Sequence, residues 1–443
     1  MKLWQKSGDS LSEVTRFTAG NDIKMDEYLV QFDLLGSIAH VMMLSKVGLV
    51  TAQEEIILTA ELKKLFQESQ NGQLKIEEGV EDIHSQVELE LTRRLGDVGK
   101  KIHSGRSRND QVLTDIKLFL REEIRLLTDS IKVTFNLLTN LAETHRDKLL
   151  PGYTHLQLAM PSSFGLWFGA YAESLADDLI SLQAAYRLTN RNPLGSAAGY
   201  GSSFPLDRDL TASLLGFEGV HVNVINAQMS RGKTERVTAQ ALANVAATLS
   251  RLSMDACLYL NPNFGFISFP EELTTGSSIM PHKKNPDVFE LIRARCNQLQ
   301  SLPNDIAMVM ANLPSGYHRD LQVIKEMVFP SFNLLRDCLS MANLMFSGIR
   351  IRENILQEEQ YSFLFSVEEV NRLVLSGVPF RDAYKQVGAS IESGNFKPER
   401  NLHHTHLGSI GQPGVNRIRD YFESEYQKFN FEAALSALKK LSS

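Results

Sequence analysis

The sequence predicts an all-α protein in which a central bundle of long helices lies between two regions of shorter helices. Residues 112–150 contain neither proline nor glycine, and their apolar side chains recur at steps of three and four, the spacing of one buried helix face. Four similar long segments follow, joined by short polar connections, which favours an elongated bundle. The chain has no block of residues typical of β-strands.

Shorter helical patterns occupy both ends of the chain. At 26–48 and 52–69 they fall within a predicted N-terminal domain of residues 1–108. Residues 355–443 are predicted as a small C-terminal helical domain, with a loop at 408–414 where glycine and proline gather.

The predicted central domain, residues 109–354, contains the long helices. The first is expected at 112–150, because Pro151 and Gly152 should end it. The others are predicted at 162–190, 231–260, 287–302 before Pro303, and 321–349 with an interruption at Pro330.

Length and composition are those of a folded protein with several domains. A chain of 443 residues exceeds what one hydrophobic core usually covers. Its net charge of −6, with 43% hydrophobic and 22% charged residues, gives no basic surface for a nucleic-acid partner. We find no apolar run that could span a bilayer and no signal-peptide core at the N-terminus. We therefore expect a soluble, cytoplasmic protein without membrane or nucleic-acid partners.

Neither the cysteines nor the histidine cluster predicts a metal site. Cys257, Cys296 and Cys338 are scattered and odd in number, which favours reduced, packed thiols over a disulfide framework or a zinc site. Three histidines at 403–406 lack the regular carboxylate or cysteine spacing of a metal site, so a surface loop is expected there.

Residues 275–286, Thr-Gly-Ser-Ser-Ile-Met-Pro-His-Lys-Lys-Asn-Pro, form the most distinctive block of the chain. The hydroxyl of Ser277 follows a flexible glycine, and Lys283 brings positive charge nearby. Asn285 and Pro286 are expected to be the N-cap and first residue of the next helix. Hydroxyls, cations and helix amides in one loop suit an anion, or negative charge that develops in a reaction.

A second block, Gly-Arg-Ser-Arg-Asn-Asp-Gln at 105–111, directly precedes the first long helix. The planar guanidinium groups of Arg106 and Arg108 match carboxylates, and the helix N-terminus adds oriented amides. A solvated basic turn is the alternative interpretation.

A third block, Pro-Gly-Tyr-Thr-His-Leu-Gln at 151–157, places His155 in a turn between two long helices. A lone histidine after a helix end is more often a structural hydrogen-bonding group than a catalyst. A nearby carboxylate would make it an acid usable near neutrality.

Residues 275–286 resemble the signature loop of the fumarase/aspartase superfamily, while 105–111 and 151–157 resemble motifs of its argininosuccinate lyase and delta-crystallin branch. The similarity extends from about residue 3 to residue 325. It implies a three-domain all-α fold and the reversible β-elimination of argininosuccinate to L-arginine and fumarate, in arginine biosynthesis. It also implies a homotetramer whose active sites are shared between subunits, and no metal or organic cofactor.

The resemblance also assigns roles to individual residues. Ser277 is expected to remove the proton, and Lys283 to stabilise the resulting negative charge. His155, supported by Glu290, is expected to protonate the leaving nitrogen. The residues expected to bind the substrate are Arg106, Ser107, Arg108, Asn109, Thr154, Arg231, Asn285, Tyr317, Gln322, Lys325 and His84.

The sequence departs from the family pattern at several positions. The family's Leu-Trp-Gly-Gly-Arg-Phe opening is Leu-Trp-Gln-Lys-Ser at residues 3–7, and an aspartate that usually follows Arg231 is replaced by Gly232. A serine of the family's substrate loop is not carried over, because only Asp22 falls near its place.

Two other functions are compatible with parts of the sequence. Adenylosuccinate lyase, or another fumarate-releasing lyase of the superfamily, is the nearer, because His-Lys-Lys-Asn at 282–285 is similar to that branch. The other is an inactive structural relative. Ser277, Lys283, His155 and Glu290 are all present, which argues against lost activity.

Overall fold

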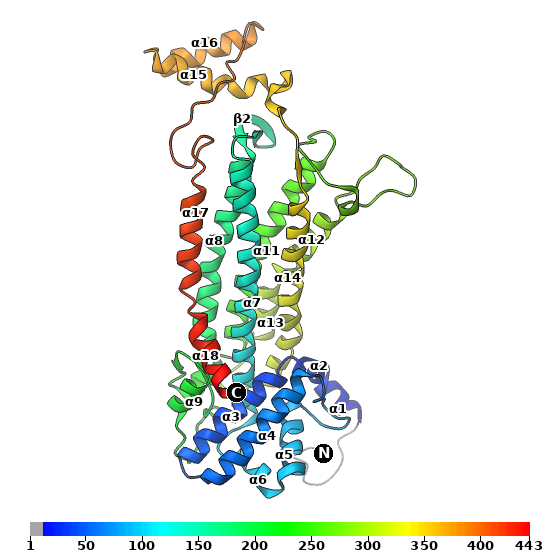
Figure 1. Ribbon diagram of the computed structural model, residues 1–443, viewed down its shortest axis with the longest axis vertical. Helices are drawn as coiled ribbons and strands as arrows, with labels where there is room; N and C mark the ends of the chain where they lie inside the picture. The colour runs from blue at the N-terminus through cyan, green and yellow to red at the C-terminus, as the bar shows by residue number, and fades with distance from the viewer. Residues whose placement is uncertain (1–11) are drawn as a thin grey trace.

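The computed structural model describes residues 12–443 and confirms the all-α fold class. Figure 1 shows an elongated molecule in which long helices run side by side between two groups of short ones. The bundle is built from α7 (Arg108–Thr144), α8 (Phe164–Thr189), α11 (Lys233–Leu260), α12 (Asp287–Leu299), α13 (Leu302–Val309) and α14 (Ile324–Ser347).

Helix α7 spans the length of the bundle. Its start is fixed by a cap of two hydrogen bonds. The Asp110 carboxylate accepts from the Ser107 backbone N–H at 2.8 Å, and the Ser107 hydroxyl accepts from the Asn109 N–H at 3.3 Å. Its apolar stripe, including Ile116, Ile124 and Ile131, is buried in the main hydrophobic cluster. The predicted spacing therefore identified the buried face of this helix.

The predicted end of the first helix was wrong. Helix α7 ends at Thr144, and residues 149–163 form an antiparallel hairpin of β1 (Leu149–Thr154) and β2 (Gln157–Ser163). The turn has positive φ at His155 (55°) and Leu156 (58°), as a two-residue hairpin turn of matching twist requires. The His155 turn therefore connects two strands and not two helices.

The predictions for Pro286 and Pro330 were also wrong, whereas a helix does end before Pro303, at Leu299. Pro286, and not Asn285, is the N-cap of α12, which begins at Asp287. Pro303 lies in the first turn of α13, where a missing N–H costs no helical hydrogen bond. Pro330 lies inside α14 without ending it, between the buried Phe329 and Phe332.

The N-terminal helices cover the lower end of the bundle in Figure 1 and share a second hydrophobic cluster with it. The helix expected at 26–48 is split, because α2 ends at Asp26 and α3 begins at Val30, whereas the prediction at 52–69 matches α4 closely. These helices are α1 (Ser12–Ala19), α2 (Asp22–Asp26), α3 (Val30–Lys46), α4 (Ala52–Gln70), α5 (Ile83–Leu95) and α6 (Asp97–Lys100).

The C-terminal region reaches both ends of the bundle. Helices α15 (Ser366–Leu375) and α16 (Phe380–Glu392) stand at the upper end in Figure 1. Helix α17 (Val415–Gln427) then runs down beside α8, and Phe422 stacks on Phe135 of α7 with ring centroids 3.9 Å apart. Helix α18 (Phe431–Ser442) packs against α3. The division at residues 108 and 354 stays a prediction.

Short elements connect the long helices. They are the helices α9 (Arg208–Leu214) and α10 (Val224–Met229), the paired strands β3 (Arg191–Asn192) with β4 (Gly219–Val220) and β5 (Ile267–Ser268) with β6 (Arg350–Ile351), and the 3₁₀ helices η1 (Lys101–His103), η2 (Glu271–Leu273), η3 (Arg319–Gln322), η4 (Ile355–Gln357) and η5 (Glu359–Phe365). Residues 403–406 lie in a loop, as expected.

Two further sequence-based expectations concern the cysteines and membrane-spanning helices. The three cysteines are free thiols, as predicted. Across residues 12–443 we find no single helix long and apolar enough to cross a membrane, although the bent pair 16–26 and 30–46 meets the length and composition criteria together.

Candidate active site

A cavity of about 400 Å³ opens at the lower end of the bundle, where the first turn of α7 meets α2, α5 and η3. This volume falls in the range of small-molecule sites. Four of the predicted substrate-binding residues line it, namely Arg108, Asn109, Tyr317 and Gln322. The remaining lining residues are Ala19, Asp22, Glu81, Asp82, Ser85, His103, Val112 and Arg319.

Arg108 is held against one wall of the cavity. Its Nη2 donates to Ser85 Oγ at 2.9 Å, and its Nε lies 3.5 Å from Asp82 Oδ2. Asp82 is the N-cap of α5 and accepts from the Ser85 backbone N–H at 2.7 Å. Burial would raise the pKa of Asp82, but His84 and Arg108 beside it lower the pKa below its usual value. The guanidinium is therefore oriented by α5 while it stays partly open to the cavity.

The neighbours of Arg108 have different structural positions. Asn109 lines the cavity, and the Ser107 hydroxyl caps α7 by accepting from the Asn109 N–H at 3.3 Å. Arg106 points the other way, where it is buried and donates to Ser37 Oγ at 3.0 Å. Burial lowers the pKa of Arg106. Of the two arginines in this motif, only Arg108 faces the cavity.

Arg231 is buried and does not line the cavity. Its Nε lies 3.0 Å from Glu235 Oε1, and its Nη2 donates to the Leu321 carbonyl at 3.1 Å. Leu321 belongs to η3, whose last residue is Gln322. In this chain Arg231 therefore fastens the segment that brings Gln322 to the cavity.

The opposite wall is formed by η3, the start of α14 and the segment between α1 and α2. The Gln322 side-chain amide donates to the carbonyls of Thr18 (3.2 Å) and Ala19 (3.4 Å). Lys325 is buried behind this wall and contacts the carboxylates of Asp26, at 2.7 Å, and Asp22.

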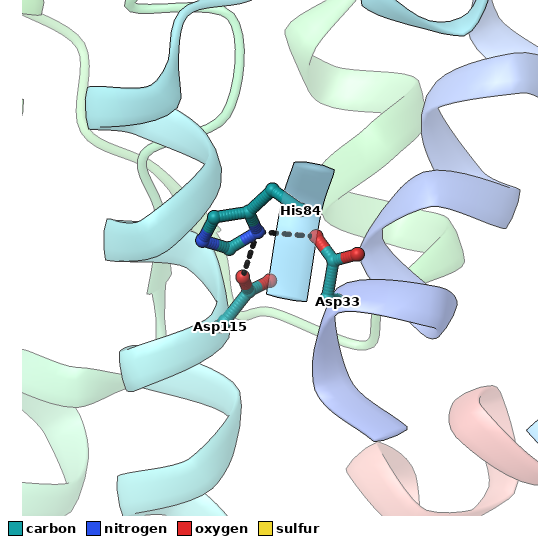
Figure 2. Close-up of side chains that lie close together, drawn as sticks. All are labelled: Asp33, His84 and Asp115. Carbon is teal, nitrogen blue, oxygen red and sulfur yellow. Dashed lines mark hydrogen bonds and ion pairs between the residues drawn. The ribbon is translucent and has the colours of Figure 1, made fainter. Parts of the chain in front are cut away.

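His84 does not line the cavity and lies in a buried polar cluster with Asp33 and Asp115 (Figure 2). Its Nδ1 lies 2.8 Å from Asp33 Oδ1 and 3.5 Å from Asp115 Oδ2, so the ring joins α3, α5 and α7. Burial raises the pKa of Asp115 well above its usual value, and the Asp33 charge adds to this effect. Although one ligand atom from each residue lies within 4.8 Å of the others, the 2.8 Å contact is a hydrogen bond that already uses Nδ1. The cluster therefore holds three helices together.

The loop at 275–286 leaves its functional groups accessible. Its ends are joined, because the Asn285 N–H donates to the Thr275 carbonyl at 2.8 Å and the Asn285 side chain donates to the Gly276 carbonyl at 3.1 Å. Ser277 is half-buried, and its Oγ accepts from the Met280 N–H at 3.2 Å. Lys283 is exposed. The loop is therefore closed at its base and open at its tip.

His155 and Thr154 are exposed at the tip of the β1–β2 hairpin, and Glu290 is exposed in the first turn of α12. No ion pair joins His155 to Glu290 within residues 12–443. The expected pairing of these two residues is therefore not made inside one chain.

The predicted site residues fall into three groups that one chain holds far apart. Helix α7, with 37 residues, places about 55 Å between Arg108 at its start and the hairpin that follows its end. Phe289, near the start of α12, packs on Phe346 at the C-terminal end of α14. Helix α14 has 24 residues, and its N-terminal end follows Gln322 of the cavity. The loop at 275–286 is therefore about 35 Å from the cavity. Figure 1 shows the hairpin at the upper end of the bundle and this loop projecting from its upper half.

Several lining residues were not among the predicted ones. Asp22 and Arg319 come from segments far apart in sequence. Asp82 lies two residues before His84, and His103 lies two residues before the block at 105–111, but neither was predicted as a site residue. Burial, together with Arg106 and Arg108, lowers the pKa of His103 to about 4, so it is neutral near pH 7. The altered residues 3–7 lie outside the described part of the chain.

Comparisons with known proteins agree on one family of enzymes. A family model described as "Lyase" matches residues 3–301. Argininosuccinate lyases of Phocaeicola vulgatus and Parabacteroides distasonis are 57% and 58% identical to this chain over 440 residues, which cover 99% of both chains in each pair.

Solved structures share the fold. An EDDS lyase variant with bound fumarate superposes with a TM-score of 0.77 at 22% identity, over 98% of this chain and 94% of that one. A class II fumarase from Schistosoma mansoni gives 0.70 at 16% identity, over 89% and 91% of the two chains.

Proposed function

The chain belongs to the argininosuccinate lyase family, and on this premise we propose that its active site is assembled from three copies of the chain. The enzyme is a carbon–nitrogen lyase that converts argininosuccinate reversibly to L-arginine and fumarate, a step of arginine biosynthesis. The high identity to argininosuccinate lyases over almost the whole chain supports this activity. The separation of Arg108, Ser277 and His155 within one chain carries the proposal about assembly.

The elimination requires removal of a carbon-bound proton beside a carboxylate. The resulting charge is very unstable in water, so preorganised donors must stabilise it. Ser277 acts as the base that takes this proton, while Lys283, Asn285 and loop amides stabilise the charge. The accessible tip of the loop suits a group that must reach a substrate bound to another subunit.

The departing guanidino nitrogen needs a proton. His155 supplies it, and Glu290 orients the imidazole and favours its protonated form. Both side chains are exposed, so each is free to meet its counterpart from another copy. Thr154 lies beside His155 and contributes to the same part of the site.

Substrate recognition is concentrated at the lower cavity. Arg108 and Asn109 hold a succinyl carboxylate, Tyr317 and Gln322 line the part of the site that receives the arginine portion, and Lys325 supports that part from behind the wall. The buried groups support these contacts from behind, since Arg231 fastens η3 and the His84 cluster fixes α5 against α7. Arg106 and Ser107 fix the start of α7, which carries Arg108 and Asn109.

A homotetramer provides the missing neighbours. Apolar side chains are exposed along the bundle, among them Val133 (58%), Leu291 (57%), Met308 (63%) and Leu344 (52%). Long helices with apolar residues on more than one face are expected where subunits pack together. The enzyme is cytoplasmic, has a central domain at 109–354, and needs no metal or organic cofactor. A monomer in sedimentation experiments that retained full activity would contradict this assembly.

The substrate is tested by offering argininosuccinate and adenylosuccinate in parallel and following fumarate by its ultraviolet absorbance. Release from argininosuccinate alone is expected. Release from adenylosuccinate instead would favour that branch, and no release from either would favour an inactive structural relative.

A further inference from the structure

Lys325, Asp22 and Asp26 form an ionic cluster at the cavity wall with one positive and two negative groups. The Lys325 ammonium is buried and contacts two carboxylates, those of Asp26 at 2.7 Å and of Asp22. The next cation, Arg231, is already paired with Glu235. One ammonium neutralises one carboxylate, so this group keeps an uncompensated negative charge.

The two carboxylates differ in what they can reach. Asp26 has a 2% exposed side chain and also accepts from the Ile83 backbone N–H at 3.3 Å, so the protein encloses it. The Asp22 side chain is 20% exposed and lines the cavity. Burial, together with the charge of Asp26, raises the pKa of Asp22 even though Lys325 lowers it. The uncompensated charge therefore lies at the cavity wall, where a cation would stabilise it.

The other cavity carboxylates are less suited to receive a cation from the ligand. Asp82 caps α5 and lies beside Arg108. Glu81 lies 4.0 Å from the Arg319 guanidinium. Within residues 12–443, Asp22 is thus the lining carboxylate whose one ion-pair partner, Lys325, is shared with a second acid.

We propose that Asp22 is a specificity-determining residue, whose carboxylate receives the α-ammonium group of the arginine portion of the substrate. This inference rests on the proposed function. L-Arginine and argininosuccinate both carry that ammonium. A ligand without the ammonium covers the Asp22 carboxylate without adding a second cation beside Lys325, and removing a charge from water without a new partner is costly.

The test compares two ligands that differ only in the α-ammonium, L-arginine and 5-guanidinopentanoate. Calorimetry measures the affinity of each for the wild-type enzyme and for Asp22→Asn. A hydrogen bond to a charged group contributes about 1.5–3 kcal/mol, so the wild type should bind L-arginine roughly ten- to a hundredfold more tightly. In Asp22→Asn the two affinities should become nearly equal.

Glu81→Gln is the matched control, because it removes a carboxylate from the same cavity and should leave the preference for L-arginine unchanged. The proposal is overturned if the wild type binds both ligands equally, or if Asp22→Asn keeps the preference. It is also overturned if Asp22→Asn weakens both ligands by the same factor, since Asp22 would then act through Lys325 alone. Because binding is measured without turnover, failure to cleave argininosuccinate would refute the proposed function separately.

Discussion

The lower cavity and the loop at 275–286 contrast in how far one chain completes them. In the cavity, Arg108, Gln322 and Lys325 each have partners that fix their positions. In the loop, hydrogen bonds join the two ends of the segment, while Lys283 and most of the tip are exposed. One chain therefore fixes the side chains of the cavity by itself, whereas in the proposed assembly the reacting groups meet the substrate only when copies associate.

This contrast has a physical reason. Groups that bind a carboxylate gain from being fixed before the substrate arrives, because ordering them later would cost affinity. The base must approach a carbon-bound proton and exclude water, which a loop can do by closing over the site.

The largest effect is expected at the exposed loop. Ser277→Ala should lower turnover by roughly two to four orders of magnitude, the usual scale for removing a positioned base, with substrate affinity largely kept. Ser278→Ala is the control, since it removes the neighbouring hydroxyl and should change turnover little. Steady-state fumarate release measures both. Near-normal turnover in Ser277→Ala would remove this residue from the mechanism.

A smaller effect is expected at the preorganised cavity. In Arg108→Lys, an ammonium cannot contact Ser85 and still present a planar pair of donors to a carboxylate. Affinity for argininosuccinate should fall roughly ten- to a hundredfold, about the free energy of one charge-assisted pair. Binding is measured in the Ser277→Ala background to prevent turnover. Unchanged affinity would mean that Arg108 has a structural function only.

The smallest effect is expected on the free energy of unfolding, from the buried His40. His40 is fully buried, and its Nε2 lies 2.8 Å from the Ser104 carbonyl, just before the arginine-rich turn. Burial lowers the pKa of His40 from 6.5 to about 3. Below pH 6.5 the unfolded chain therefore binds a proton that the folded chain does not, and stability falls as the pH decreases towards 3.

From pH 7 to pH 5 this histidine should cost about 2 kcal/mol of unfolding free energy. Urea unfolding at the two pH values measures the change in the wild type and in His40→Gln, in which an amide replaces the ring. From pH 7 to pH 5, His40→Gln should lose about 2 kcal/mol less unfolding free energy than the wild type. An equal loss in both proteins would mean that His40 does not titrate below its ordinary range.

The sequence predicted the long helices better than their ends. The apolar stripe of α7 was visible because a buried helix face repeats every three or four residues. Its end at Thr144 was not, since Leu149 and Leu150 continue the apolar pattern into a strand. Proline had the opposite effect, because Pro330 suggested a break that the packing of α14 does not allow.

The sequence predicted which residues belong to the candidate site, but not how they lie relative to one another in space. Arg108, Tyr317 and Gln322 were assigned to the site by the resemblance of their motifs to the family, and the structure brings them to one cavity. The contacts of Lys325 with Asp22 and Asp26 join residues about 300 positions apart, the latter separated by 299. No local pattern records such a contact, so the acidic part of the cavity emerged only with the fold.

The assembly of the site from several copies is tested most directly by combining two defective variants. Ser277→Ala and Arg108→Ala lie in regions that one chain keeps about 35 Å apart, and each alone should be nearly inactive. Co-expressed with different tags and isolated as mixed oligomers, they should regain about a quarter of wild-type turnover, because random mixing gives that fraction of sites both intact groups. Mixed oligomers as inactive as the parent variants would contradict the account.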